Sequence, residues 1–241
     1  MIPAVAPAGR GAVALTTHVV VGATRLAAAV RTTGRPLHPV GQLRNASLHR
    51  HGLDPALGVP FLDARGTDEV LVRESRSLGL PGWLPDVHGL ALRVPNPDGS
   101  QGDLLFVSTG WGRVTRFTMA PTRSTYGRPL TSLVPYRTVA GAVQLGLREV
   151  SPDVLALSCS VGGAPWRRVG ELVLAGTRSG PEVDFDPTLH TVPGLEHYPV
   201  SELLQARSHR AARASRASSG GPRPVPLPAG RPRSRRPPTT P

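Results

Sequence analysis

Short apolar segments separated by Gly, Pro and Asp turns constrain the fold of this chain more than any other feature. Seven candidate strands follow one another with almost no helical pattern between them. They are residues 40–50, 69–75, 89–95, 103–108, 136–148, 153–161 and 166–175. The connecting sequences NPDGSQG and SPD are typical of hairpins. The pattern predicts a mainly β structure, an antiparallel sheet that curls into a barrel or a sandwich.

Helices are expected only at the two ends of this sheet. His18 and Arg25 interrupt the apolar residues 11–30, so we expect an amphipathic helix there rather than a membrane span of about 20 residues. A second helix is expected from Pro199 to Ala217. The predicted organisation is an N-terminal helical segment at 1–34, a β domain with a C-terminal helix at 35–217, and a disordered tail at 218–241.

The strong positive charge of the chain is concentrated near its C-terminus. Nine of the 28 arginines lie in residues 207–241, which contain no acidic residue, and this leaves 19 arginines against 16 acidic residues elsewhere. The chain before residue 207 is therefore close to neutral. The tail contains one Gly-Arg-Pro-Arg sequence at 230–233, of the kind that enters the DNA minor groove. We expect a disordered tail with weak, nonspecific contact to nucleic acid.

Cysteine usage bears on the compartment. Cys159 is the single cysteine, which excludes an internal disulfide and a cysteine-based metal site. This usage fits a reducing compartment, and a cytoplasmic location is expected.

The segment RPLHPVGQLRNASLHRHGLDP holds three of the eight histidines. His49 and His51 are two residues apart and so share one strand face, and Asp54 follows at the next turn. These three residues resemble half of the metal site of a metal-dependent hydrolase. A strand that ends in a Gly-Leu-Asp-Pro turn explains the same residues without a metal. The downstream candidates do not repeat a recognised metal spacing: Asp86, His88 and His190.

Three further motifs, taken in order, resemble the core of the haem-dependent catalases. The first is Arg-x-x-His-x-x-Gly, the second is Val-Arg-x-Ser, and the third is Asp-x-x-Gly-x-Ala-x-Arg followed by a Gly-Asp turn. In this sequence they are Arg35, His38 and Gly41; Val72, Arg73 and Ser75; and Asp86, Gly89, Ala91 and Arg93. The resemblance covers roughly residues 35–110.

The resemblance implies a catalase-like antiparallel β-barrel that binds haem and acts on hydrogen peroxide or an organic hydroperoxide. It implies that His38 is the distal acid and base, taking a proton from one peroxide oxygen and returning it to the other. Ser75 would bond to the far ring nitrogen of His38 and fix its tautomer. Arg35 and Arg73 would pair with the haem propionates.

The chain also departs from the catalase pattern. The proximal tyrosine of the family lies in an Arg-x-Phe-x-Tyr segment that is absent here, and His209 is the one substitute on the expected C-terminal helix. Glu74 replaces a phenylalanine and is expected on the strand face opposite Arg73 and Ser75. A catalase fold that has lost haem and binds a small ligand or partner is therefore an alternative. The available tyrosines are Tyr126, Tyr136 and Tyr198.

Overall fold

The computed structural model describes residues 41–198, apart from residues 78–79, 82 and 180–182. The two expected helices, the Arg- and Pro-rich tail, Arg35, His38 and His209 lie outside the described residues. Within the described part, no helix has the length and hydropathy needed to cross a bilayer.

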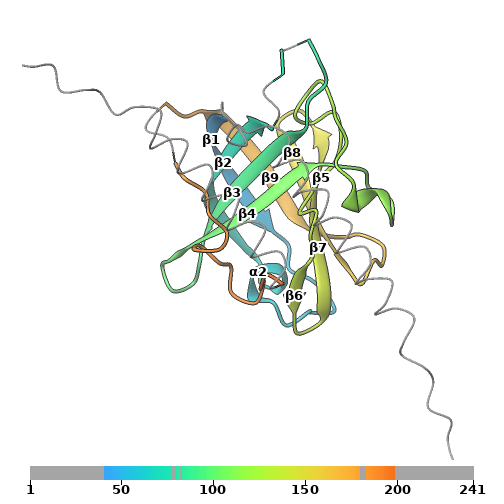
Figure 1. The fold of residues 1–241 in the computed structure, drawn as a ribbon. Coiled ribbons are helices and arrows are strands. Elements are labelled where there is room, and N and C mark those ends of the chain that lie inside the picture. Colours follow the sequence, from blue (N-terminus) through green and yellow to red (C-terminus); the bar gives the residue numbers. More distant parts are fainter. Residues whose placement is uncertain (1–40, 78–79, 82, 180–182, 199–241) are drawn as a thin grey trace, which may run out of the picture.

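Nine antiparallel strands and two short helical turns form the described part of the chain (Figure 1). The turns are α2 (Pro60–Asp63) and the 3-10 turn η1 (Thr115–Phe117). The strands are β1 (Gly41–Arg50), β2 (Gly66–Arg76), β3 (His88–Pro95), β4 (Gln101–Ser108), β5 (Leu130–Thr131), β6 (Tyr136–Thr138), β7 (Gly141–Ser151), β8 (Val154–Val161) and β9 (Arg167–Thr177).

The sheet closes into a barrel. Its strand order is β5-β4-β3-β2-β1-β9-β8-β7-β6, and β5 also pairs with β7. This second pairing, between Leu130 and Leu147 and between Thr131 and Gly146, joins eight strands in a ring and leaves β6 as an extension beside β7. The closed antiparallel barrel confirms the predicted fold class.

Two details of the barrel differ from the sequence prediction. The expected strand 136–148 is two strands, because the chain turns at Val139 and Ala140 and Gly141 adopts a φ of 103°. The apolar run VAGAV hides this turn from a periodicity argument. The two-residue strand β5 was not predicted, because two residues are too few to show an alternating pattern.

The barrel interior is filled mainly by aliphatic side chains, in keeping with an aromatic content of only 4%. Leu48, Val72, Leu92 and Leu157 are inaccessible to solvent, and Phe106 is 1% exposed. All belong to one buried cluster that includes residues from β1 to β9. Since side chains alternate along a strand, the intervening residues face outward.

Two loop segments cover the outside of this barrel. Residues 183–198, which we call the strap, run down the outside of the barrel toward α2 (orange in Figure 1). Phe185 of the strap packs on Leu43 and Ala91. Residues 110–117 pack against the outside of β7 and β8, where Arg116 bonds to Ser160.

We predict that Phe106→Ala lowers the free energy of unfolding by about 3–5 kcal/mol, because it leaves a cavity in the barrel interior. Urea denaturation of the full chain measures the change. Val139→Ala serves as control: Val139 is 85% exposed, so the change should stay within about 0.5 kcal/mol. Equal effects of the two substitutions would contradict a core centred inside the barrel.

Candidate functional site

The outward-facing residues of β1 to β4 form three rows across the sheet, because each strand pairs in register with the next. The first row combines two glycines and a serine with one apolar residue, so this end of the face is flat. The rows are Gly41, Ser75, Gly89 and Val107; Leu43, Arg73, Ala91 and Leu105; and Asn45, Leu71, Arg93 and Asp103.

Arg73 and Ser75 meet at the flat end of this face, as their two-residue spacing predicts. Ser75 is 8% exposed, and its Oγ lies 3.4 Å from the carbonyl oxygen of Gly89. The guanidinium of Arg73 lies against the α-carbon of Gly41, where an added Cβ would be 2.5 Å from Nε. Glycine at position 41 therefore lets the guanidinium lie across β1 beside Ser75.

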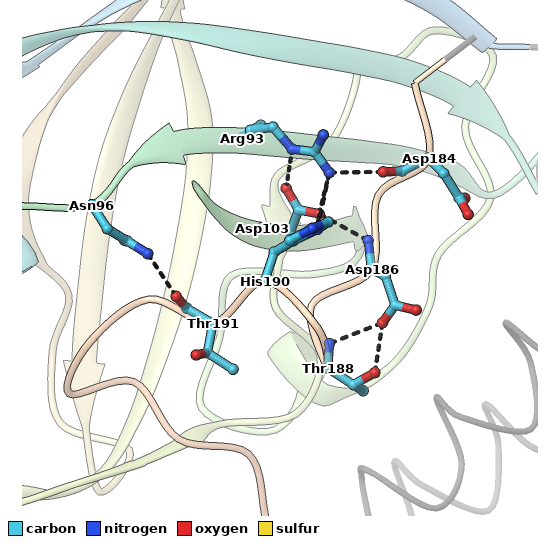
Figure 2. A network of polar contacts seen from close by, with 8 residues as sticks. All are labelled: Arg93, Asn96, Asp103, Asp184, Asp186, Thr188, His190 and Thr191. Atoms are coloured by element: carbon cyan, nitrogen blue, oxygen red, sulfur yellow. Dashed lines mark hydrogen bonds and ion pairs between the residues drawn. The ribbon is translucent and has the colours of Figure 1, made fainter. Parts of the chain in front are cut away.

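An ion pair holds the strap against the other end of the face (Figure 2). Asp103 is 2% exposed and accepts hydrogen bonds from Nε and Nη2 of Arg93, both at 2.7 Å. This two-pronged contact is a strong form of ion pair. Three groups of the strap join it: His190 Nδ1 lies 2.9 Å from Asp103, the Asp186 amide donates to Asp103, and the Asp184 carbonyl accepts from Arg93.

The strap also covers apolar surface next to this ion pair. The ring of Phe185 lies 4.8 Å from the Arg93 guanidinium carbon and packs on Leu43 and Ala91. The strap therefore borders the flat row of Gly41, Ser75, Gly89 and Val107. The sequence places Arg93 in a catalase-like motif and His190 among the metal candidates without a recognised spacing, and it does not predict that the two form one network with Asp103.

Glu74 points into the barrel, on the face opposite Arg73 and Ser75, as predicted. Its carboxylate accepts a hydrogen bond of 2.5 Å from the Tyr126 hydroxyl and pairs with Arg44 at 3.4 Å. Burial, and then the bond to Glu74, raise the pKa of Tyr126 well above its usual value. A charged residue inside the barrel is thus compensated by a cation and a phenol.

The described residues satisfy only part of what haem requires. The row of Gly41, Ser75, Gly89 and Val107 carries few bulky side chains, and Arg73 places a cation next to it. The three rows contain no imidazole, phenol or thiol that would be an axial ligand. Tyr126 is bound to Glu74 inside the barrel, and Tyr136 is part of the buried core.

The structure does not assemble the alternative metal site. His49 Nδ1 lies 3.1 Å from the Thr67 hydroxyl, while His51 and Asp54 are exposed beyond the end of β1. Among the described residues, no three His, Cys, Asp or Glu side chains are close enough to hold a metal ion. The strand-end explanation of these residues therefore accounts for the structure.

Comparison with known proteins relates the fold, but not the sequence, to a family. No protein-family model and no curated protein matches the sequence. Among solved structures, a fungal catalase aligns with a TM-score of 0.52 and 16% identity over 76% of this chain and 59% of that one. A bacterial catalase aligns with a TM-score of 0.53 and 14% identity over 76% and 57%. Catalase A from Saccharomyces cerevisiae aligns with a TM-score of 0.51 and 14% identity, and the alignment covers 74% of this chain and 60% of that one.

The fold is catalase-like. At 14–16% identity, the likeness concerns the fold alone. The chain spans less than two thirds of the length of these catalases, between 57% and 60%.

We predict that Asp103→Asn lowers the free energy of unfolding by about 3–5 kcal/mol, because it leaves the Arg93 cation without its buried partner. Urea denaturation measures the loss. Glu196→Gln is the matched control, since it breaks the Arg137–Glu196 pair, whose side chains are 60% and 62% exposed, at the other end of the strap. Its effect should stay below about 1 kcal/mol. If Asp103→Asn also lowers the free energy of unfolding by less than about 1 kcal/mol, Asp103 does not anchor the strap.

Proposed function

We propose that this protein is a catalase-like haem-binding protein that acts on hydrogen peroxide or an organic hydroperoxide. In this proposal the haem lies on the flat end of the outer face of β1–β4. One observation carries the proposal: the Arg73 guanidinium lies across Gly41 and beside Ser75 on a row of small residues. These three residues belong to the motifs that resemble those of catalases.

Each residue of the face has a proposed task. Arg73 would donate paired hydrogen bonds to a propionate, for which its planar fork is suited. Gly41 leaves room for the Arg73 guanidinium, and the absence of a side chain at Gly89 would let the ring approach the sheet beside it. His38 and Arg35, which lie outside the described residues, would supply the acid–base group and a second cation, with Ser75 orienting His38. When bound, haem supplies the redox chemistry toward the peroxide bond.

The alternative is a catalase-fold protein that binds a small ligand or a partner without haem. It is favoured by the lack of an axial ligand on the three described rows and by the engagement of Tyr126 and Tyr136 elsewhere. The same flat face and the same Arg73 would then serve a carboxylate ligand of another kind. Both proposals place the ligand on the same wall of the barrel, and they differ in whether iron is held.

We predict that the full chain, titrated with haem, develops a Soret band and that Arg73→Ala weakens haem binding about 10- to 100-fold. A charge-assisted hydrogen bond contributes about 1.5–3 kcal/mol, which accounts for this range. Gly41→Val should weaken haem binding to a similar extent. The valine side chain displaces the Arg73 guanidinium, although Arg73 itself and its charge are retained. Arg168→Ala, which removes a surface arginine paired with Glu171, is the control and should bind haem normally.

Two results would argue against haem on this face. A chain that stays colourless after haem titration would leave the ligand- or partner-binding alternative. A Soret band of equal strength in the parent chain, Arg73→Ala and Gly41→Val would mean that haem binds somewhere else.

A further inference from the structure

A second cationic site lies on a different wall of the barrel. Residues 110–117 cover the outer face of β7 and β8, where Gln144 and Ser160 form a cross-strand pair. Arg116 of η1 reaches this face and donates from Nη1 to Ser160 Oγ at 2.5 Å. The catalase-like motifs and the proposed haem face do not involve these residues.

Arg116 is 2% exposed, yet only part of its hydrogen-bonding capacity is used. Nε donates to the Gly112 carbonyl at 3.1 Å, and Nη1 donates once to Ser160. A guanidinium has five N–H donors, so three donors, both on Nη2 among them, have no acceptor within the described part of the chain. Among the described residues, the side-chain nitrogens and oxygens that have neither solvent contact nor a hydrogen-bond partner belong to Arg76, His88 and Gln144. Nη2 of Arg116 has no partner and is not among these atoms, so it retains some contact with solvent.

No carboxylate of the described residues pairs with Arg116. Burial, and then the nearby charge of Arg113, lower the pKa of Arg116. The guanidinium carbon lies 4.3 Å from the ring centre of Trp166, and the carbonyl and hydroxyl oxygens solvate it further. These contacts offset part of the desolvation cost, but they add no negative charge. Buried charges in proteins are normally paired, and the described residues provide no counter-ion for this cation.

The surrounding contacts hold the Arg116 site rigid. The Arg116 carbonyl accepts hydrogen bonds from Thr131 Oγ1 at 2.8 Å and from Gln144 Nε2 at 3.1 Å. The Trp166 ring is stacked on Trp111 at 4.1 Å, with its indole N–H bonded to the Trp111 carbonyl. Arg148 lies over the Trp111 ring at 5.5 Å. The donors of Arg116 are thus fixed before any ligand arrives, which lowers the entropy cost of binding.

We propose that Arg116, assisted by Arg113, binds a small oxyanion such as inorganic phosphate at the outer face of β7 and β8. The oxyanion takes its hydrogen bonds from the free donors of the guanidinium, which are planar and suited to two oxygens at once. Arg113 adds positive charge at the rim. A neutral ligand would leave the Arg116 cation uncompensated, and a cation would be repelled by both arginines.

Tryptophan fluorescence of the full chain tests this site, because Trp166 lies directly under Arg116. Trp83, which is 75% exposed, is first changed to phenylalanine, so that the signal comes from Trp111 and Trp166. Inorganic phosphate is then titrated against sodium chloride of equal ionic strength. We expect a saturable fluorescence change with phosphate and none with chloride.

Three variants in the Trp83→Phe background separate the site from general charge effects. Arg116→Gln should abolish the phosphate response. Arg113→Gln should weaken phosphate binding about two- to fivefold, the size expected of an exposed charge. Arg137→Gln, which removes an exposed arginine near the strap, should leave the affinity unchanged.

The outcomes decide the proposal in either direction. A phosphate response that is lost in Arg116→Gln and weakened in Arg113→Gln supports it. The absence of a saturable response, or a response that Arg116→Gln retains, overturns it. If Arg116→Gln fails to fold, Arg113→Gln decides the proposal. The proposal is overturned if Arg113→Gln binds phosphate as tightly as Arg137→Gln does.

Discussion

The pairing of β5 with β7 is the interaction on which the rest of the structure depends. Leu130 and Thr131 of β5, at one edge of the sheet, pair with β7 near the other edge. This pairing closes the sheet and gives it an inside and an outside. Aliphatic side chains fill the inside. The candidate chemistry therefore lies on the outer walls, where the strap and the 110–117 loop cover different pairs of strands.

The two outer walls follow the same physical rule. Where a loop covers a charged side chain on the barrel surface, the group that pairs with the charge has a large effect on the free energy of unfolding. Arg93 has that partner in Asp103. In the two proposals, Arg73 would bind a carboxylate on β1–β4, and an oxyanion on β7–β8 would supply negative charge to Arg116. Arg73 and Arg116 thus lie on two different outer walls, and only Arg73 belongs to a catalase-like motif.

Sequence reasoning predicted the fold class and the meeting of Arg73 with Ser75, because alternation along a strand is a local property. The face of Glu74 followed from the same alternation. The Arg93–Asp103 pair needed the register of the β3–β4 hairpin, which the sequence leaves open until the turn is known. The contact of Arg116 with Ser160 joins residues 44 positions apart and has no local signal. The sequence shows that Tyr126 and Tyr136 are available, but their engagement by Glu74 and by the core depends on tertiary packing and has no local signal.

In the proposed function, the main ligand lies on the flat outer face of β1–β4. Paramagnetic broadening by haem iron, measured on the backbone amide signals of the full chain, tests the position directly because it depends on distance from the iron. The account predicts that Ser75 and Gly89 lose intensity on haem addition while Gly146, on the β7 wall, keeps it. Broadening centred on Gly146, with Ser75 and Gly89 unaffected, would contradict the account.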